Sequence, residues 1–145
     1  MSRDAEIMDA LQTRLETIRT IGGYQTNIGQ RVFIHRAYEL GQNELPAILA
    51  EDIDIEHDYS AVMGMTRNTM TVHLTVVQSG IGSLAEARKA RADMKKCLHG
   101  YETVGGNANS LKVIKSSILM KQYEKLTAGS MLTVIVEYDT SRDAI

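Results

Sequence analysis

A glycine-containing turn is the stretch of this chain that comes closest to a chemical motif. Gly80-Ile81-Gly82-Ser83-Leu84-Ala85 fits the G-x-G-x-x-A pattern of dinucleotide-binding proteins, in which glycines let the backbone approach a pyrophosphate at a helix N-terminus. The strand before such a turn is normally buried on both faces and almost wholly apolar. Here Thr71, His73 and Thr75 interrupt it, and too few residues follow for paired nucleotide-binding halves. We therefore expect an ordinary turn, with a small nucleotide-binding enzyme as the more distant alternative.

An acidic run in the first half of the chain begins like a calcium-binding loop. Such a loop has oxygen ligands at positions one, three and five and a glycine at position six, where the chain bends sharply. The run Asp52-Ile53-Asp54-Ile55-Glu56-His57-Asp58 has His57 at position six and isoleucine between its carboxylates. Alternating acid and isoleucine is typical of a strand. We therefore predict a strand here and no metal site.

The same alternation predicts which side chains share a face of that strand. Every second side chain points to one side, so Ile53 and Ile55 lie on one face and the carboxylates lie on the other. The predicted acidic face is Asp52, Asp54, Glu56 and Asp58. A row of like charges is unfavourable unless cations oppose it. We favour ion pairs across a subunit contact, with Arg31, Arg36 and Arg67 as candidate partners; the alternatives are the lining of a lumen and a solvated strand face.

The remaining reactive side chains lack the spacing of a catalytic or metal site. Cys97 lies beside Met94 and Leu98 on a predicted helix, which favours a buried small hydrophobe over a nucleophile. The four histidines have no zinc-binding spacing, and the chain has no nucleophile elbow and no phosphate-binding Gly-Lys-Ser/Thr. We therefore expect a protein that is not an enzyme, with no catalytic residue, cofactor or bound metal.

Composition predicts a single soluble globular domain over residues 1–145. Apolar residues make up 43% and charged residues 23%, and no apolar stretch approaches the roughly 20 residues that span a bilayer. The net charge of −2 predicts no general attraction to nucleic acid. Residues Met1 to Glu6 lack the apolar segment of a secretory signal, and a single cysteine agrees with a reducing compartment. We expect the protein to be made in a cytoplasm and to stay out of membranes.

Hydrophobic periodicity predicts the elements that would position these residues. Residues spaced by three and four indicate helices over Ala5–Ile21, ended by Gly22-Gly23, and over Leu84–Leu98, opened by a capping box of Ser83 and Glu86. Period-two alternation and extended patterns indicate strands at Gln30–Ala37, Leu45–Asp58, Thr69–Val76, Leu111–Met120 and Leu132–Tyr138. The predicted fold class is α/β, with one small mixed or mostly antiparallel sheet and two helices packed on one of its faces.

A hairpin tip between the second and third strands is the predicted docking element. The interval between Glu56 and Asn68 is polar and contains a glycine. Its candidate contact residues are Tyr59, Met63, Met65 and Arg67. Tyrosine and methionine are enriched in interface cores, so we expect a loop that orders on contact; a tip folded back on its own sheet is an equal alternative.

The order of these elements resembles that of the tail-terminator, or tail-completion, proteins of long-tailed bacteriophages. The resemblance covers nearly the whole chain and is most legible at Leu45-Pro46-Ala47 and Val136-Glu137-Tyr138-Asp139. It implies a structural virion protein that binds the last ring of the tail tube, usually as a hexameric ring, and stops its polymerisation. It also implies a place at the head-tail junction, contacts with the tail-tube and neck proteins, and a lumen through which DNA passes without specific binding.

The resemblance carries over no individual functional residue, because this family has no catalytic motif. The interface candidates are therefore the acidic strand, Asp52 to Asp58, and the hairpin tip, Tyr59 to Arg67. The nearest alternative function is another head-tail neck component, such as a stopper or an adaptor.

Overall fold

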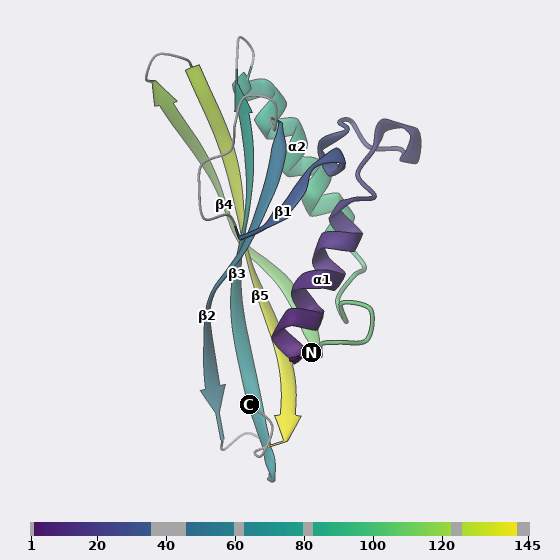
Figure 1. Ribbon diagram of the computed structural model, residues 1–145, viewed down its shortest axis with the longest axis vertical. Helices are drawn as coiled ribbons and strands as arrows, with labels where there is room; N and C mark the ends of the chain where they lie inside the picture. The colour runs from purple at the N-terminus through teal and green to yellow at the C-terminus, as the bar shows by residue number, and fades with distance from the viewer. Residues whose placement is uncertain (1, 36–45, 60–62, 80–82, 123–125, 142–145) are drawn as a thin grey trace.

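A computed structural model describes residues 2–35, 46–59, 63–79, 83–122 and 126–141 of the protein. Along the chain the elements are α1 (Arg3–Leu15), two 3-10 turns η1 (Thr20–Gly22) and η2 (Ile28–Gln30), β1 (Val32–Ile34), β2 (Ala47–Asp58), β3 (Met65–Ser79), α2 (Ser83–Leu98), β4 (Ser110–Gln122) and β5 (Leu126–Ser141). The strands form one five-stranded sheet in the order β1-β2-β3-β5-β4 (Figure 1). The turn at Gly80–Gly82 lies outside the described residues.

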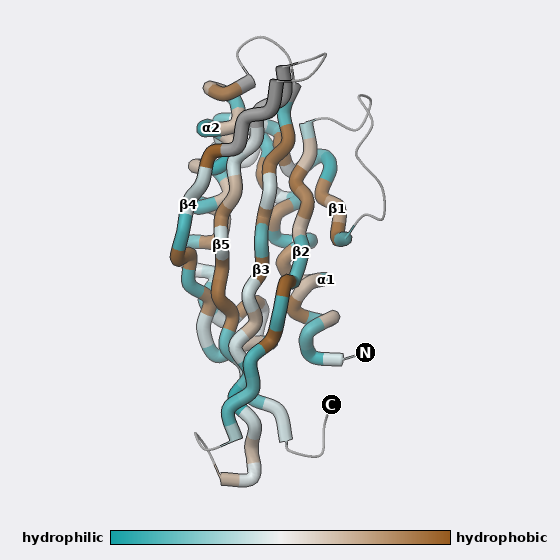
Figure 2. The backbone as a smooth tube through the Cα atoms, turned by 90° about the vertical axis from the view of Figure 1, so that its left-hand side faces the viewer, coloured by the Kyte–Doolittle hydropathy of each residue, from teal (hydrophilic) through white to brown (hydrophobic). Residues whose placement is uncertain are grey.

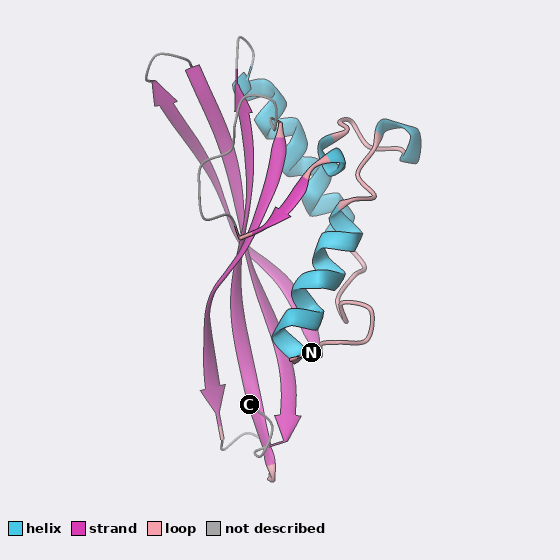
Figure 3. Ribbon diagram, in the orientation of Figure 1, coloured by secondary structure: helices cyan, strands magenta, loops and turns pink. Residues whose placement is uncertain are grey.

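The sheet is mixed, and both α-helices lie on the same side of it (Figure 3). β1 runs parallel to β2, whereas the other neighbouring pairs are antiparallel. Figure 2 looks onto the opposite side, which we call the outer face, with α1 and α2 behind the strands. The side that carries the helices is the helix face. The predicted α/β class, with a mixed sheet and two helices on one face, is confirmed.

Alternation in the central strands separates the core from the outer face, as predicted. On β3, Met70, Val72 and Leu74 are fully buried on the helix face. The residues between them, Thr71 and His73, are only partly buried. Period-two burial of this kind identifies a sheet with one packed face.

Polar contacts supplement the apolar packing of α2 between α1 and the sheet. The buried Ser130 hydroxyl on β5 donates to the carbonyl of Ala87 at 2.8 Å. Arg14 Nε of α1 donates to the carbonyl of Cys97 at 3.0 Å, and the guanidinium of Arg14 lies over the Tyr101 ring. Cys97 is buried, as predicted.

The first helix is shorter than predicted, because it ends at Leu15 rather than at Gly22-Gly23. The Thr17 hydroxyl donates to the carbonyl of Arg14 at 2.6 Å, and the amide of Ile18 bonds to Leu15 only three residues back. Side-chain bonds of this type compete with helical hydrogen bonds, and β-branched residues have low helix propensity. Ile18 is still buried, so the apolar spacing was real although the helix had ended.

The strand predicted at Gln30–Ala37 is also shorter, since β1 covers only Val32–Ile34. Gln30 belongs to η2, and residues 36–37 lie outside the described part of the chain. Val32 lies in the core and Ile34 packs against it, so the two side chains share the helix face.

A bulge in β2 contradicts the predicted acidic face. Asp52 is the register partner of Val72, and Asp54 is the partner of Thr71. Ile53 is therefore an extra residue with no partner on β3. An extra residue exchanges the two faces of a strand for every position beyond it.

The four carboxylates consequently divide between the two faces. Asp52 shares the helix face with Val72, and Ile55 lies on that face beyond the bulge, packed against the core. Asp54, Glu56 and Asp58 lie on the outer face. The prediction of one four-carboxylate face was wrong at Asp52, because the bulge replaces a regular alternation that the sequence pattern assumes.

The hairpin tip is shorter than predicted. β2 continues to Asp58 and β3 begins at Met65, with His57 paired to Asn68 and Asp58 to Arg67. Met65 and Arg67 are therefore strand residues and do not belong to a loop. The loop prediction was wrong at these two positions; Tyr59 and Met63 remain at the tip.

Candidate functional site

The sheet extends past the first turn of α1 (Figure 1), and a cleft lies between the residues that meet there. Its volume is about 770 Å³. The walls come from the start of α1, the far ends of β2, β3 and β5, and Tyr59 of the tip. We call it the lower cleft; its lining includes Asp4, Ile55, His57, Asn68, Tyr138 and Thr140.

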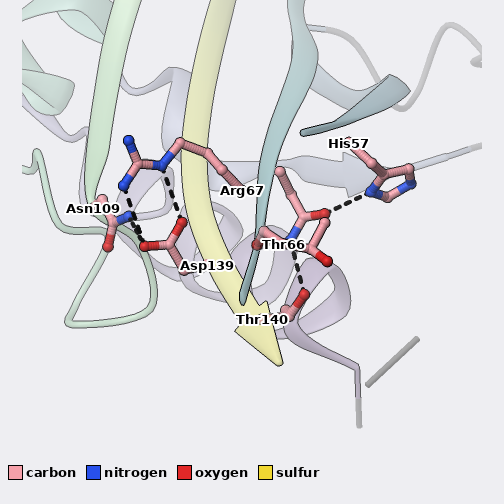
Figure 4. Close-up of polar contacts among 7 residues, drawn as sticks. His57, Thr66, Arg67, Asn109, Asp139 and Thr140 are labelled. Atoms are coloured by element: carbon pink, nitrogen blue, oxygen red, sulfur yellow. Dashed lines mark hydrogen bonds and ion pairs between the residues drawn. The ribbon is translucent and has the colours of Figure 1, made fainter. Parts of the chain in front are cut away.

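Polar side chains in the lower cleft bond to one another across three strands (Figure 4). Asn68 is buried, and its Nδ2 donates to the Thr140 hydroxyl at 3.0 Å and more weakly to the carbonyl of Thr66. The Thr66 carbonyl can only accept, so it fixes the amide orientation, and Asn68 Oδ1 faces His57 Nδ1 at 2.6 Å. An amide oxygen only accepts, so Nδ1 of His57 carries the proton. The cluster satisfies the buried amide of Asn68 and positions His57 in the wall of the cleft.

An ion pair links β3 and β5 on the outer face of the sheet. Arg67 Nε donates to Asp139 Oδ1 at 3.1 Å, and Asn109 Nδ2 donates to Asp139 Oδ2 at 3.0 Å (Figure 4). The hydrogen bond from Arg67, then that from Asn109, lowers the pKa of Asp139. The same bond raises the pKa of Arg67, to which Glu137 and Asp58 contribute by charge. Arg67, a candidate partner for the acidic strand, is therefore bonded to β5 and lies opposite Asp58 in register.

Tyr138 brings an aromatic hydroxyl to the lower cleft. Its ring is buried on the helix face of β5. Burial, followed by the charges of Asp4 and Asp52, raises the pKa of Tyr138. The cleft thus holds a neutral phenol, an imidazole and nearby carboxylates, which can accept and donate hydrogen bonds to a polar chain.

The described residues include no group of three or more His, Cys, Asp or Glu side chains placed to hold a metal ion. Across the same residues, no helix has the length and apolar character needed to cross a membrane. The chain matches no protein-family model and no curated protein.

The outer face is the second candidate surface, and it is charged unevenly. Glu51, Asp54, Glu56 and Asp58 lie on its β2 side. Lys112 and Lys115 lie on its β4 side. Between the two groups, at the same levels of the sheet, lie Thr71 and His73 of β3 and Thr133 and Ile135 of β5. Opposite charge at the two lateral borders of one face gives the molecule an acidic side and a basic side.

The candidates from the sequence do not form one site. Asp52 bonds to His35 Nε2 at 2.5 Å on the β1 side of the sheet. Tyr59 and Met65 line the lower cleft, whereas Met63 projects from the tip with 96% of its surface exposed. The acidic residues beyond the bulge stay together on the outer face.

Several residues of these surfaces were missed by sequence reasoning. His57 and Asn68 sit on different strands, and only the register after the bulge places them opposite each other. Lys112 and Lys115 flank a second bulge, between Val113 and Lys115, that again breaks the period-two pattern. The sequence signal that could have indicated a basic edge on β4 was the pair Lys112 and Lys115 beside the apolar Val113 and Ile114.

Proposed function

We propose that the protein is a structural component of a bacteriophage tail, a tail terminator that caps the tail tube as a ring. In this role it stops polymerisation of the tube and forms the tail side of the head-tail junction. Its partners are further copies of itself, the tail-tube protein and a neck protein. The virion is its place of action.

The observation that carries the proposal is the one-sided covering of the sheet. Both α-helices pack on the helix face, so the outer face has no covering layer among the described elements (Figure 2). Such a sheet has an open face and lateral edges that suit packing between copies. An acidic border on β2 and a basic border on β4 make the two sides of the block complementary rather than alike.

The charge of the outer face supports passage of DNA without retention. Asp54 and Glu56 are exposed there, and carboxylates do not neutralise phosphates as lysine and arginine do. In a ring that turns its outer faces toward the lumen, these carboxylates would offset the lysines of β4 and leave few unpaired cations to retain DNA.

Deletion of the gene from the phage that carries it tests the role. A missing terminator leaves the tube free to grow, so we expect tails of uneven and excessive length under the electron microscope, with filled heads left unjoined. Expression of the intact gene from a plasmid is the control and should restore uniform tails. Tails of normal length beside unjoined heads would instead assign the protein to the neck, and normal virions would reject the proposal.

A further inference from the structure

We infer that copies of this protein join side by side through two bulged strand edges, the β2 edge of one copy meeting the β4 edge of the next. The occupant of each edge is thus a second copy of the same chain. The inference deepens the proposed function and rests on it for closure of the copies into a ring.

Both edges are free of ladder partners among the described strands. β1 pairs with β2 at Ile48, Leu49 and Ala50, and the Asp52 amide donates to the ring of His35 just beyond β1 at 3.3 Å. From Ile53 on, no described strand forms a ladder with β2 on that side. β4 is the last strand of the sheet, and its single neighbour is β5. Strand edges of this kind are where sheets contact other chains.

Each edge carries a bulge with an exposed isoleucine between charges of one sign. Ile53 on β2 is 50% exposed and lies between Asp52 and Asp54. Ile114 on β4 is 59% exposed, and Lys112 and Lys115 flank its bulge. A bulge interrupts the hydrogen-bonding ladder, so contact at these points is made by side chains and not by a continuous sheet. An apolar residue flanked by acids thus matches an apolar residue flanked by lysines.

The two bulges lie at the same level of the sheet. Asp54 is paired with Thr71, and Thr71 with Ile135. Ile135 is paired with Lys112, so Asp54 and Lys112 share one row across the strands.

The next row on the outer face, toward the start of β2, has the same arrangement of an acid and a lysine. Glu51 is paired with His73, and His73 with Thr133. Thr133 is in turn the register partner of Lys115. A neighbouring copy placed beside the first without sliding along the strands therefore brings each acid next to a lysine.

Contacts without a shift along the strands favour a closed ring of copies. A head-to-tail contact that includes a shift along the strands generates a helical filament, whereas one without a shift closes into a ring when the rotation allows. Asp54, Lys112 and Lys115 are exposed and Glu51 is partly buried, so the contact weakens as salt shortens the Debye length to about 3 Å near 1 M.

The opposite interpretation is that bulges and lysines only keep the edges from aggregating, which is a common use of both. That interpretation predicts no preferred contact between Ile53 and Ile114. Disulfide trapping between positions 53 and 114 distinguishes the two interpretations. The natural Cys97 is buried, so it contributes little cross-linking of its own.

The test uses the full chain with Ile53→Cys and Ile114→Cys together, oxidised gently at high concentration. We expect a ladder of cross-linked species that stops at one closed oligomer. Each single variant should give no species larger than a dimer, because it offers one accessible thiol per chain besides the buried Cys97. The matched control combines Ile53→Cys with Ile21→Cys, since Ile21 is 95% exposed and lies away from β4.

Charge reversal gives an independent readout on the same contact. Asp54→Lys alone should lower the population of oligomers at least tenfold in native mass spectrometry, and adding Lys112→Asp should restore it. Glu102→Lys makes the same charge change on an exposed loop and should have no effect.

The outcomes separate this inference from the proposed function. Wild-type rings on tails together with no ladder and no effect of Asp54→Lys would overturn the edge contact and leave the terminator role standing. Absence of rings from both the free protein and purified tails would overturn both.

Discussion

Arg67 and Asp139 join the two central strands of the sheet, with the guanidinium Nε of one donating to the carboxylate of the other at 3.1 Å. They are register partners on β3 and β5, on the outer face beside the tip. Asn109 adds a bond to the same carboxylate, so the loop before β4 is tied to the end of the ladder. Arg67, which was expected to bind a neighbouring subunit, thus joins two strands of its own chain.

The lowered pKa of Asp139 predicts a pH-dependent contribution to stability. Its folded value lies below the ordinary value of about 4, so the contribution is present above pH 4 and is lost as the pH falls through the folded value. Asp139→Asn should therefore lower the free energy of unfolding at pH 7 by up to about 1 kcal/mol, because the pair is partly exposed. Urea titrations at pH 7 and pH 3 measure this. Equal losses at both pH values would show that the carboxylate charge contributes nothing.

The two methionines of the predicted tip should behave differently. Met63 is almost fully exposed, so Met63→Ser should change the free energy of unfolding by less than about 0.5 kcal/mol while weakening attachment to tails. Met65 is a partly buried strand residue in the lower cleft, so Met65→Ser should cost roughly 1 kcal/mol. Thermal melts and sedimentation with purified tails provide the two readouts. Normal attachment by the Met63 variant would remove the tip from the docking surface.

Gly29 is predicted to tolerate no side chain. A Cβ there would lie 2.5 Å from the carbonyl oxygen of Leu15 and 2.8 Å from that of Ile18, both of them backbone atoms. Gly29→Ala should therefore destabilise the protein by about 1–3 kcal/mol through overpacking. Gly22→Ala is the control, because its nearest neighbour would be at an ordinary 3.7 Å. Similar urea midpoints for the two variants would contradict the close approach.

A buried carboxylate on α2 is predicted to hold the segment that follows α1. Asp93 is 2% exposed. It accepts hydrogen bonds from the amides of Gln25 and Thr26 and from the Thr26 hydroxyl at 3.1, 2.8 and 2.6 Å. Asp93→Asn replaces one acceptor by a donor and should cost about 2–3 kcal/mol, whereas Thr26→Val removes one donor and should cost about 1 kcal/mol. Chemical denaturation compares them; a smaller loss for the Asp93 variant would contradict this account.

Periodicity was sufficient for the parts of the fold that pack on one another. The alternation of Met70, Val72 and Leu74 and the small inward residues of α2 identified β3 and the second helix, because burial imposes a fixed spacing on each. The prediction extended α1 too far, because the apolar Ile18 keeps the helical spacing although the helix ends at Leu15. Spacing reports which side chains are buried, and it does not report the hydrogen bonds of the backbone.

The candidate surfaces were harder to predict, because they depend on register between strands. An extra residue at Ile53 and a second bulge at Ile114 move every later side chain to the other face, and neither leaves a signature in residue types. The acids after the bulge were found by sequence, but their neighbours were not. Arg67 was expected as an ion-pair partner of the acidic strand; it lies opposite Asp58 in register, but the carboxylate that it binds within the chain is Asp139.

The position of β5 has a consequence for how the chain acquires its structure. It follows the other described strands in sequence, yet it lies between β3 and β4, which have no ladder contact with each other. During synthesis β3 and β4 cannot join one sheet until residues 126–141 have left the ribosome, and their apolar sides stay partly uncovered in the interval. Contacts between segments far apart in sequence slow folding, and uncovered strands in the interval favour aggregation. Premature termination within β5 should therefore yield insoluble chains rather than a smaller folded domain.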